Sequence, residues 1–190
     1  MKFSIGANDK QLLTMPQSTT VPVTGTTVVQ LFERLNVHNV ISLFTAVMTD
    51  NKILFQSDSY SLLYESCHAL TSLMYPFVYS HVYIPLLPSS LLEMLSSPTP
   101  FIMGVHSSLQ DEVEDLLDVI VVDLDVGCIS IPDCIHLPKL DGPAYNEMVY
   151  QLRSVITPQL MRKDVALRSS HLKSSPPHLL VKHIHFLYLS

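Results

Sequence analysis

Hydrophobic and polar positions along the chain follow two periods, and the change from one to the other marks successive helices and strands. From residue 27 to about residue 49 apolar residues recur at three-and-four spacing, which predicts helical structure with one buried face. Asn36 falls inside this segment, and asparagine is a favoured N-cap, so we predict a short helix to Leu35 and a second helix after it. The expected buried stripe of the second helix is Val37, Val40, Ile41, Phe44 and Val47 or Met48.

The alternation continues after this helical segment. Residues 52–56 (KILFQ) predict a strand, and Ser57 or Ser59 is expected to begin a helix that Pro76 ends. The apolar stripe of that helix is Leu62, Leu63, Cys67, Leu70, Leu73 and Met74. Residues 75–107 read YPFVYSHVYIPLLPSSLLEMLSSPTPFIMGVHS, in which five prolines separate short apolar runs. Because proline fixes φ and lacks an amide hydrogen, we predict a buried strand at 81–86, a proline-started helix at 89–95 and a second strand at 101–105.

The last predicted elements complete an α/β pattern. Residues 118–124 (DVIVVDL) form an apolar run between carboxylates, typical of a strand covered on both faces. A tight turn then leads to residues 128–131 as an antiparallel partner, and residues 143–156 predict a helix that ends before Pro158. Strands that alternate with helices predict an α/β fold, a layered and mostly parallel sheet with helices on both faces.

Three of these segments together resemble one known domain. Residues 75–107 resemble the central segment of a DENN domain, the module of a family of guanine-nucleotide exchange factors for Rab GTPases. Residues 28–77 (VVQLFERLNVHNVISLFTAVMTDNKILFQSDSYSLLYESCHALTSLMYPF) are similar to its opening helices, first strand and following helix, and residues 118–138 (DVIVVDLDVGCISIPDCIHLP) to its later strand pair. The segments KFSIGANDKQ and VPVTGT near the start are most similar to the SET-binding factor branch, which carries an inactive myotubularin phosphatase downstream.

The resemblance covers roughly residues 2–166 and implies a function. It implies a central DENN lobe that promotes GDP release from a Rab GTPase in vesicle or endosomal trafficking, with no bond-breaking chemistry of its own and no cofactor. A related DENN or myotubularin protein is a further expected partner. Because the chain starts just before the central lobe, the longin-like lobe that precedes it in the family is expected to be missing. The alternative is a truncated, non-exchanging Rab-binding or scaffold fragment of a myotubularin-related pseudophosphatase.

The expected organisation has three parts. Residues 1–26 are predicted to be a linker with a remnant strand near residues 2–5, because residues 6–25 are rich in Thr, Pro and Gly. Residues 27–166 form the expected central DENN domain. Residues 167–190 combine Ser/Pro-rich low complexity with an apolar end and are predicted to be an unpacked tail.

Composition narrows the classes further. With 190 residues, 47% of them hydrophobic and 15% charged, the chain suits one globular domain with a sizeable core. A net charge of −6 gives no basic footprint for nucleic acid. No apolar run reaches the length of a membrane span, no secretory signal opens the chain, and its three cysteines fit no zinc spacing. A cytoplasmic protein is expected, at most peripheral on endosomal or vesicle membranes.

Charge is unevenly distributed along the chain and gives most of the candidates for partner binding. Residues 111–125 hold seven carboxylates and no Lys or Arg, whereas six of the eleven basic residues follow Tyr150. The simpler interpretation is a solvated acidic face and a basic surface helix. The alternative is an acidic patch that orients a partner. On that basis the weak candidates are Asp111, Glu112 and Asp115. Because a few aromatic and charged side chains on loops carry most of the energy of an interface, Tyr79 in the loop at 78–81 is a further weak candidate.

Several patterns resemble active sites and are weaker. Asp123 and Asp125 would share a strand face near Asp118, as in a metal-dependent hydrolase, but no Gly-rich phosphate loop precedes them. There is no G-x-S-x-G nucleophile elbow, and Cys67 lies on an apolar stripe, where a core role is expected. We expect no catalytic, metal or cofactor residues. The histidines with an expected structural role are His81 and His106, and the weak metal pair is His183 and His185.

Overall fold

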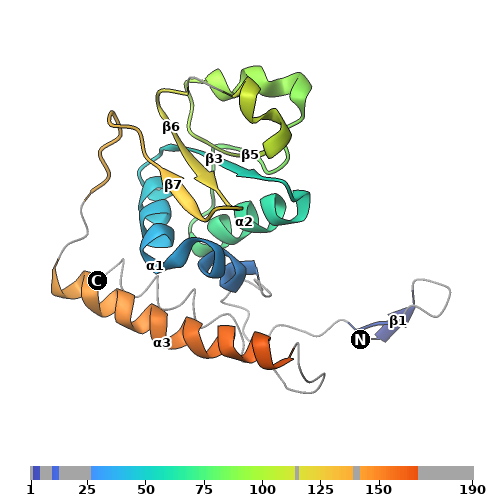
Figure 1. The fold of residues 1–190 in the computed structure, drawn as a ribbon, viewed down its shortest axis with the longest axis vertical. Helices are drawn as coiled ribbons and strands as arrows, with labels where there is room; N and C mark the ends of the chain where they lie inside the picture. Colours follow the sequence, from blue (N-terminus) through green and yellow to red (C-terminus); the bar gives the residue numbers. More distant parts are fainter. Residues whose placement is uncertain (1, 5–9, 13–26, 114–115, 139–141, 167–190) are drawn as a thin grey trace.

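A five-stranded sheet forms the centre of the protein in this computed structural model, which describes residues 2–4, 10–12, 27–113, 116–138 and 142–166. The strand order is β4-β5-β3-β6-β7 (Figure 1). The strands are β3 (Lys52–Ser57), β4 (Val82–Ile84), β5 (Phe101–His106), β6 (Val119–Asp123) and β7 (Cys128–Ser130). All neighbours pair in parallel except β6 and β7, which are antiparallel. The predicted α/β fold with a mostly parallel sheet is confirmed.

The central strand β3 shows why this sheet needs cover on both sides. Side chains alternate between the two faces of a strand, and here Ile53 and Phe55 enter one apolar cluster while Leu54 enters the other. All three side chains are fully buried. The uninterrupted apolar run at residues 53–55 is therefore the pattern expected for a strand such as β3, which has a parallel neighbour on each side.

One face is covered by the helices α1 (Thr27–Met48) and α2 (Tyr60–Leu73). α1 bends at Asn36, whose φ of 51° and ψ of 166° are not helical, and the Asn36 side-chain oxygen accepts a 3.0 Å hydrogen bond from the Asn39 amide. The predicted cap between two helical pieces is thus confirmed. Ser59 caps α2 in the same way, through a 3.4 Å bond from the Leu62 amide. Both predicted stripes are buried, with Met48 and Leu62 partly buried at their margins.

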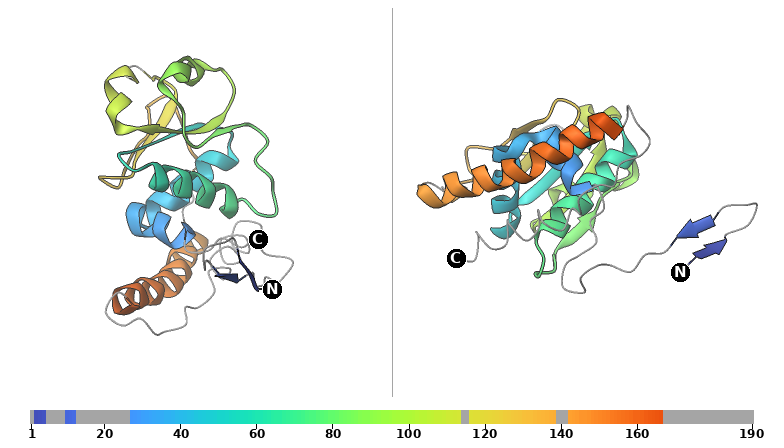
Figure 2. Two further views of the ribbon diagram at one scale, coloured as in Figure 1. Left: turned by 90° about the vertical axis from the view of Figure 1, so that its right-hand side faces the viewer. Right: turned by 90° about the horizontal axis from the view of Figure 1, so that it is seen from below.

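The helix α3 (Pro143–Ala166) packs on the opposite side of α1 from the sheet, so α1 lies between them (Figures 1 and 2). Its buried apolar residues are Met148, Val149, Leu152 and Ile156. The predicted end before Pro158 is wrong, because the helix continues to Ala166. A proline removes one backbone hydrogen bond, and that loss did not end this helix.

The other face of the sheet is covered by two 3₁₀ helices, η1 (Ser89–Ser96) and η2 (Ser107–Glu112). The helix predicted at 89–95 is therefore present in a tighter form than expected. Leu95 of η1 packs in the second apolar cluster with Met103 and Val105 of β5. Short 3₁₀ turns suit this face because they cover a few side chains without the length of an α-helix.

Two further predictions need correction. The strand predicted as buried at 81–86 is the edge strand β4, with Tyr83 37% exposed, because it pairs with β5 alone. The strand predicted near residues 2–5 is present as β1 (Lys2–Ser4), but the expected linker contains its antiparallel partner β2 (Lys10–Leu12). The predicted tail lies outside the described residues. None of the helices that the structure describes has the length and apolar character needed to cross a bilayer.

Candidate functional site

The carboxyl ends of the parallel strands meet at one edge of the sheet. β3 is flanked in parallel by β5 on one side and β6 on the other, so the chain connections diverge at its carboxyl end. In open α/β sheets this divergence opens the crevice where ligands commonly bind. The residues at this edge therefore decide whether the fold offers a conventional ligand site.

The carboxylate of Asp125 occupies this position. Its two oxygens accept hydrogen bonds from Ser57 Oγ at 2.7 Å, from the Asp58 amide at 2.9 Å and from Ser107 Oγ at 3.3 Å. Desolvation, the largest single influence, raises the pKa of Asp125, but the hydrogen bonds from Ser57, Asp58 and Ser107 together outweigh it and leave the pKa below its ordinary value. The negative charge near the start of α2 is therefore the carboxylate of Asp125 itself. Its hydrogen bonds connect the segments that follow β3, β5 and β6.

Asp123, the other half of the predicted metal pair, shapes the β6–β7 turn. Its Oδ1 accepts 2.9 Å bonds from the amides of Asp125 and Val126, and Gly127 closes the turn with a φ of 79°. Asp118 lies at the opposite end of β6, where it forms a 2.7 Å ion pair with Lys52. Within the described part of the chain no three His, Cys, Asp or Glu side chains are grouped to hold a metal ion. The three carboxylates thus have separate local roles.

His106 and His81 are both hydrogen-bonded, as predicted. His106 Nε2 lies 3.0 Å from the Asp58 carbonyl, and Nδ1 accepts a 3.2 Å bond from the Ser108 amide, which caps η2. The proton is therefore on Nε2, which donates to the carbonyl. His81 Nε2 lies 3.1 Å from Asp50 Oδ1. Each ring thus links two segments of the chain.

The acidic candidates fall next to this edge. Asp111 and Glu112 are exposed on η2, which begins immediately after His106. Asp115 lies outside the described residues. The structure therefore leaves two of the three predicted carboxylates accessible on the surface beside the carboxyl edge.

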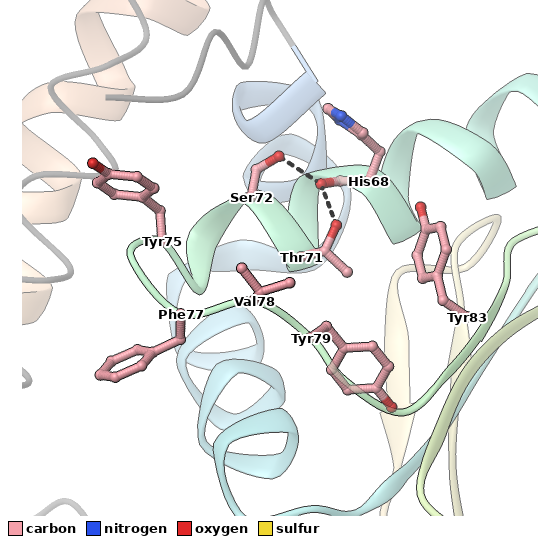
Figure 3. A pocket seen from close by; sticks show the side chains of 8 residues that line it. All are labelled: His68, Thr71, Ser72, Tyr75, Phe77, Val78, Tyr79 and Tyr83. Carbon is pink, nitrogen blue, oxygen red and sulfur yellow. Dashed lines mark hydrogen bonds between the residues drawn. The ribbon is translucent and has the colours of Figure 1, made fainter. Parts of the chain in front are cut away.

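Tyr79 lies beside a pocket of about 370 Å³ between α2 and the chain that leads to β4 (Figure 3). Its ring packs against the main apolar cluster. Its buried hydroxyl is directed away from α2 and has no hydrogen-bond partner among the residues that the structure describes. Burial, and then the nearby Asp50 carboxylate, raise the pKa of Tyr79 above its ordinary value. Tyr79 is thus mainly a packing residue. Its neighbours Phe77 and Val78 are exposed hydrophobic residues of this segment, at 47% and 86%.

Cys67 is fully buried on the inner face of α2, as its place on the apolar stripe predicted. Burial raises the pKa of its thiol far above the ordinary range, so the reactive thiolate is suppressed. The adjacent His68 instead lines the pocket on the outer side of α2. Cys67 is therefore a core side chain.

Comparison with known proteins gives the family. The DENN (AEX-3) domain family matches residues 1–127, which is most of the chain. The chain belongs to the DENN family. Myotubularin-related protein 5 of Caenorhabditis elegans is 38% identical over 146 residues, which cover 77% of this chain and 8% of that protein. The DENN domain and WD repeat-containing protein SCD1 of Arabidopsis thaliana is 32% identical over 149 residues, 78% of this chain and 12% of that protein.

Other DENN proteins match a shorter part. The DENN domain-containing protein 2A of Mus musculus is 38% identical over 96 residues, which cover 50% of this chain and 10% of that protein. The chain thus spans about a tenth of the length of the curated relatives that it matches. The predicted DENN resemblance is confirmed, and a myotubularin-related protein is among the relatives.

One surface of this DENN chain was missed by sequence reasoning. Tyr60 and Tyr64 are 61% and 51% exposed on the outer face of α2. The signal was available, because both tyrosines lie off the apolar stripe of a helix whose outer face would ordinarily be polar. The sequence analysis used the stripe to place the core and did not examine the other face.

Proposed function

We propose that this chain is a DENN module that promotes GDP release from a Rab GTPase in vesicle or endosomal trafficking. The observation that carries the proposal is the match of residues 1–127 to the DENN family. Proteins of this family are generally regulators that work with Rab GTPases. The arrangement at the carboxyl edge agrees with such a role, because the Asp125 carboxylate at this edge is hydrogen-bonded to Ser57 and Asp58 of the protein itself.

Such a regulator acts by differential binding. A protein that binds the nucleotide-free GTPase more tightly than the GDP-bound form weakens GDP binding by the same factor. A tenfold acceleration that arises entirely from such coupling corresponds to about 1.4 kcal/mol. The proposed functional unit is residues 27–166, and the surface beside η2, with Asp111 and Glu112 exposed, is the proposed place of contact.

The test is release of a fluorescent GDP analogue from a panel of purified Rab GTPases, with and without the chain. Acceleration of at least one Rab supports exchange, and Glu112→Gln should reduce it. Glu147→Gln is the matched control, since Glu147 is also exposed but lies on α3, on the far side of α1 from the sheet. A folded chain that accelerates none of the Rabs refutes exchange by this chain. Direct binding to nucleotide-free Rab would then indicate a scaffold.

A further inference from the structure

The outer face of α2 is aromatic. Tyr60 and Tyr64 are four residues apart, so they lie on the same side of the helix, and both are more than half exposed. The Tyr60 ring lies 4.7 Å from the ring of His106, and the Tyr64 ring lies 6.1 Å from the ring of His68, nearly parallel to it. These contacts hold each tyrosine against the protein while most of its surface remains accessible.

This aromatic face continues into the pocket. His68, Thr71 and Ser72 of α2 form one wall, and Phe77 and Val78 lie across from them (Figure 3). The Thr71 and Ser72 hydroxyls both donate to the His68 carbonyl, so their hydrogens are already engaged within the helix and do not face the pocket as free donors. The wall thus presents mainly carbon atoms and rings. A continuous exposed apolar surface of this kind marks an interaction site.

The charge of the surrounding chain identifies the kind of partner. Residues 53–138 contain eleven Asp and Glu residues and no Lys or Arg. Asp58 is exposed just before α2, and Asp111 and Glu112 are exposed on η2, which follows the His106 that contacts Tyr60. Anionic lipid surfaces and nucleic acids are repelled by such a surface. A protein segment with basic side chains is complementary to it.

We propose that the outer face of α2 and the adjoining pocket bind a basic amphipathic segment of another protein. An apolar side chain of that segment enters the pocket beside Phe77 and Val78. Arginine guanidinium groups stack on the exposed rings of both Tyr60 and Tyr64, with Asp58 as the nearby counter-charge. Arginine fits better than lysine because its planar guanidinium stacks on aromatic faces. This binding requires no GTPase, so it goes beyond the proposed exchange function.

The experiment measures binding of the full chain to a fluorescent helical peptide. In this peptide leucines recur at three-and-four spacing, and arginines recur at the same spacing beside them. Versions with lysine, glutamine or glutamate in place of arginine keep the leucines fixed. The arginine peptide should bind most tightly and the glutamate peptide should not bind. Tyr60→Leu and Tyr64→Leu should each weaken the arginine peptide about two- to fivefold, the effect of one exposed cation–π contact. Tyr64→Phe keeps the ring and should keep the affinity.

Tyr150→Leu is the matched control, because Tyr150 is 67% exposed but lies on α3. These substitutions preserve net charge, so a general attraction between an acidic protein and a basic peptide remains the same in all of them. Equal affinities in the Tyr60→Leu, Tyr64→Leu and Tyr150→Leu variants would overturn the proposal, as would equal binding of the glutamate peptide. A dimer of this chain that Tyr64→Leu disrupts would assign the surface to a second copy and also overturn it.

Discussion

Asp125 Oδ1 accepts a 2.7 Å hydrogen bond from Ser57 Oγ, which joins the loop after β6 to the end of β3 across 68 residues of sequence. Together with the bonds from the Asp58 amide and from Ser107 Oγ, it fixes three segments with one exposed carboxylate. We predict that Asp125→Ala lowers the free energy of unfolding by about 1 kcal/mol, a value reduced for solvent exposure. Urea denaturation measures it, and Asp133→Ala is the exposed control.

The same carboxylate predicts a dependence on pH. Its pKa is lower in the folded protein than in the unfolded chain, so its contribution is complete above the ordinary aspartate pKa of about 3.9 and is lost as pH falls through the folded value. In the Asp125→Asn variant the decrease of stability below about pH 4 should be shallower than in the wild type. Identical acid-denaturation curves for the two proteins would contradict this role for Asp125.

Gly104 of β5 lies directly against the backbone that follows β4. A β-carbon added there would lie 2.1 Å from the Pro85 carbonyl oxygen, in a backbone segment whose Leu87 amide donates a 2.7 Å bond to the Gly104 carbonyl. We predict that Gly104→Ala destabilises the protein by about 3 kcal/mol, because β4 must separate from β5. Gly142→Ala is the control, since its β-carbon meets nothing within 4 Å and only the φ of 107° adds a cost of about 1 kcal/mol. Both are measured by denaturant unfolding.

The three cysteines should differ in reactivity. Cys128 and Cys134 are exposed and Cys67 is buried with a raised thiol pKa. We predict that iodoacetamide labels two thiols rapidly in the native protein and that Cys67 reacts at least about a thousandfold more slowly, since its access requires unfolding. Mass spectrometry of the labelled peptides checks the order. Rapid labelling of Cys67 would show that α2 opens independently of the rest of the core.

The helices and inner strands of this fold were predictable because their sequence signals are local. Asn36 and Ser59 each cap a helix through a side chain bonded to an amide three residues later, and that signal depends on neighbours in the chain alone. The apolar run of β3 likewise indicates burial on both faces without knowledge of its partners. These signals also support the family resemblance, which rests on the order of the same segments.

The errors arise where the outcome depends on distant contacts. β4 has the apolar sequence of an inner strand, yet its position at the sheet edge follows from the strand order, which no local pattern contains. Asp123 and Asp125 share a spacing typical of metal ligands, but Ser57 at the end of β3 and Ser107 at the start of η2 donate to Asp125 and give it a structural role. Pairing across long sequence separations therefore decides which carboxylates remain available to a partner.

The contact between α3 and α1 combines a buried centre and a polar margin, and the two should differ in their energetic weight. Leu152 is fully buried in the main cluster. At the margin Arg153 donates a 3.1 Å bond to His38 Nε2, so the histidine proton is on Nδ1, which lies 2.7 Å from the Tyr145 hydroxyl. We predict that Leu152→Ala costs about 2–5 kcal/mol and that Tyr145→Phe costs less than about 1 kcal/mol. Thermal and urea unfolding measure both, and equal losses would contradict the prediction, because the polar margin would then stabilise α3 as much as the apolar contact does.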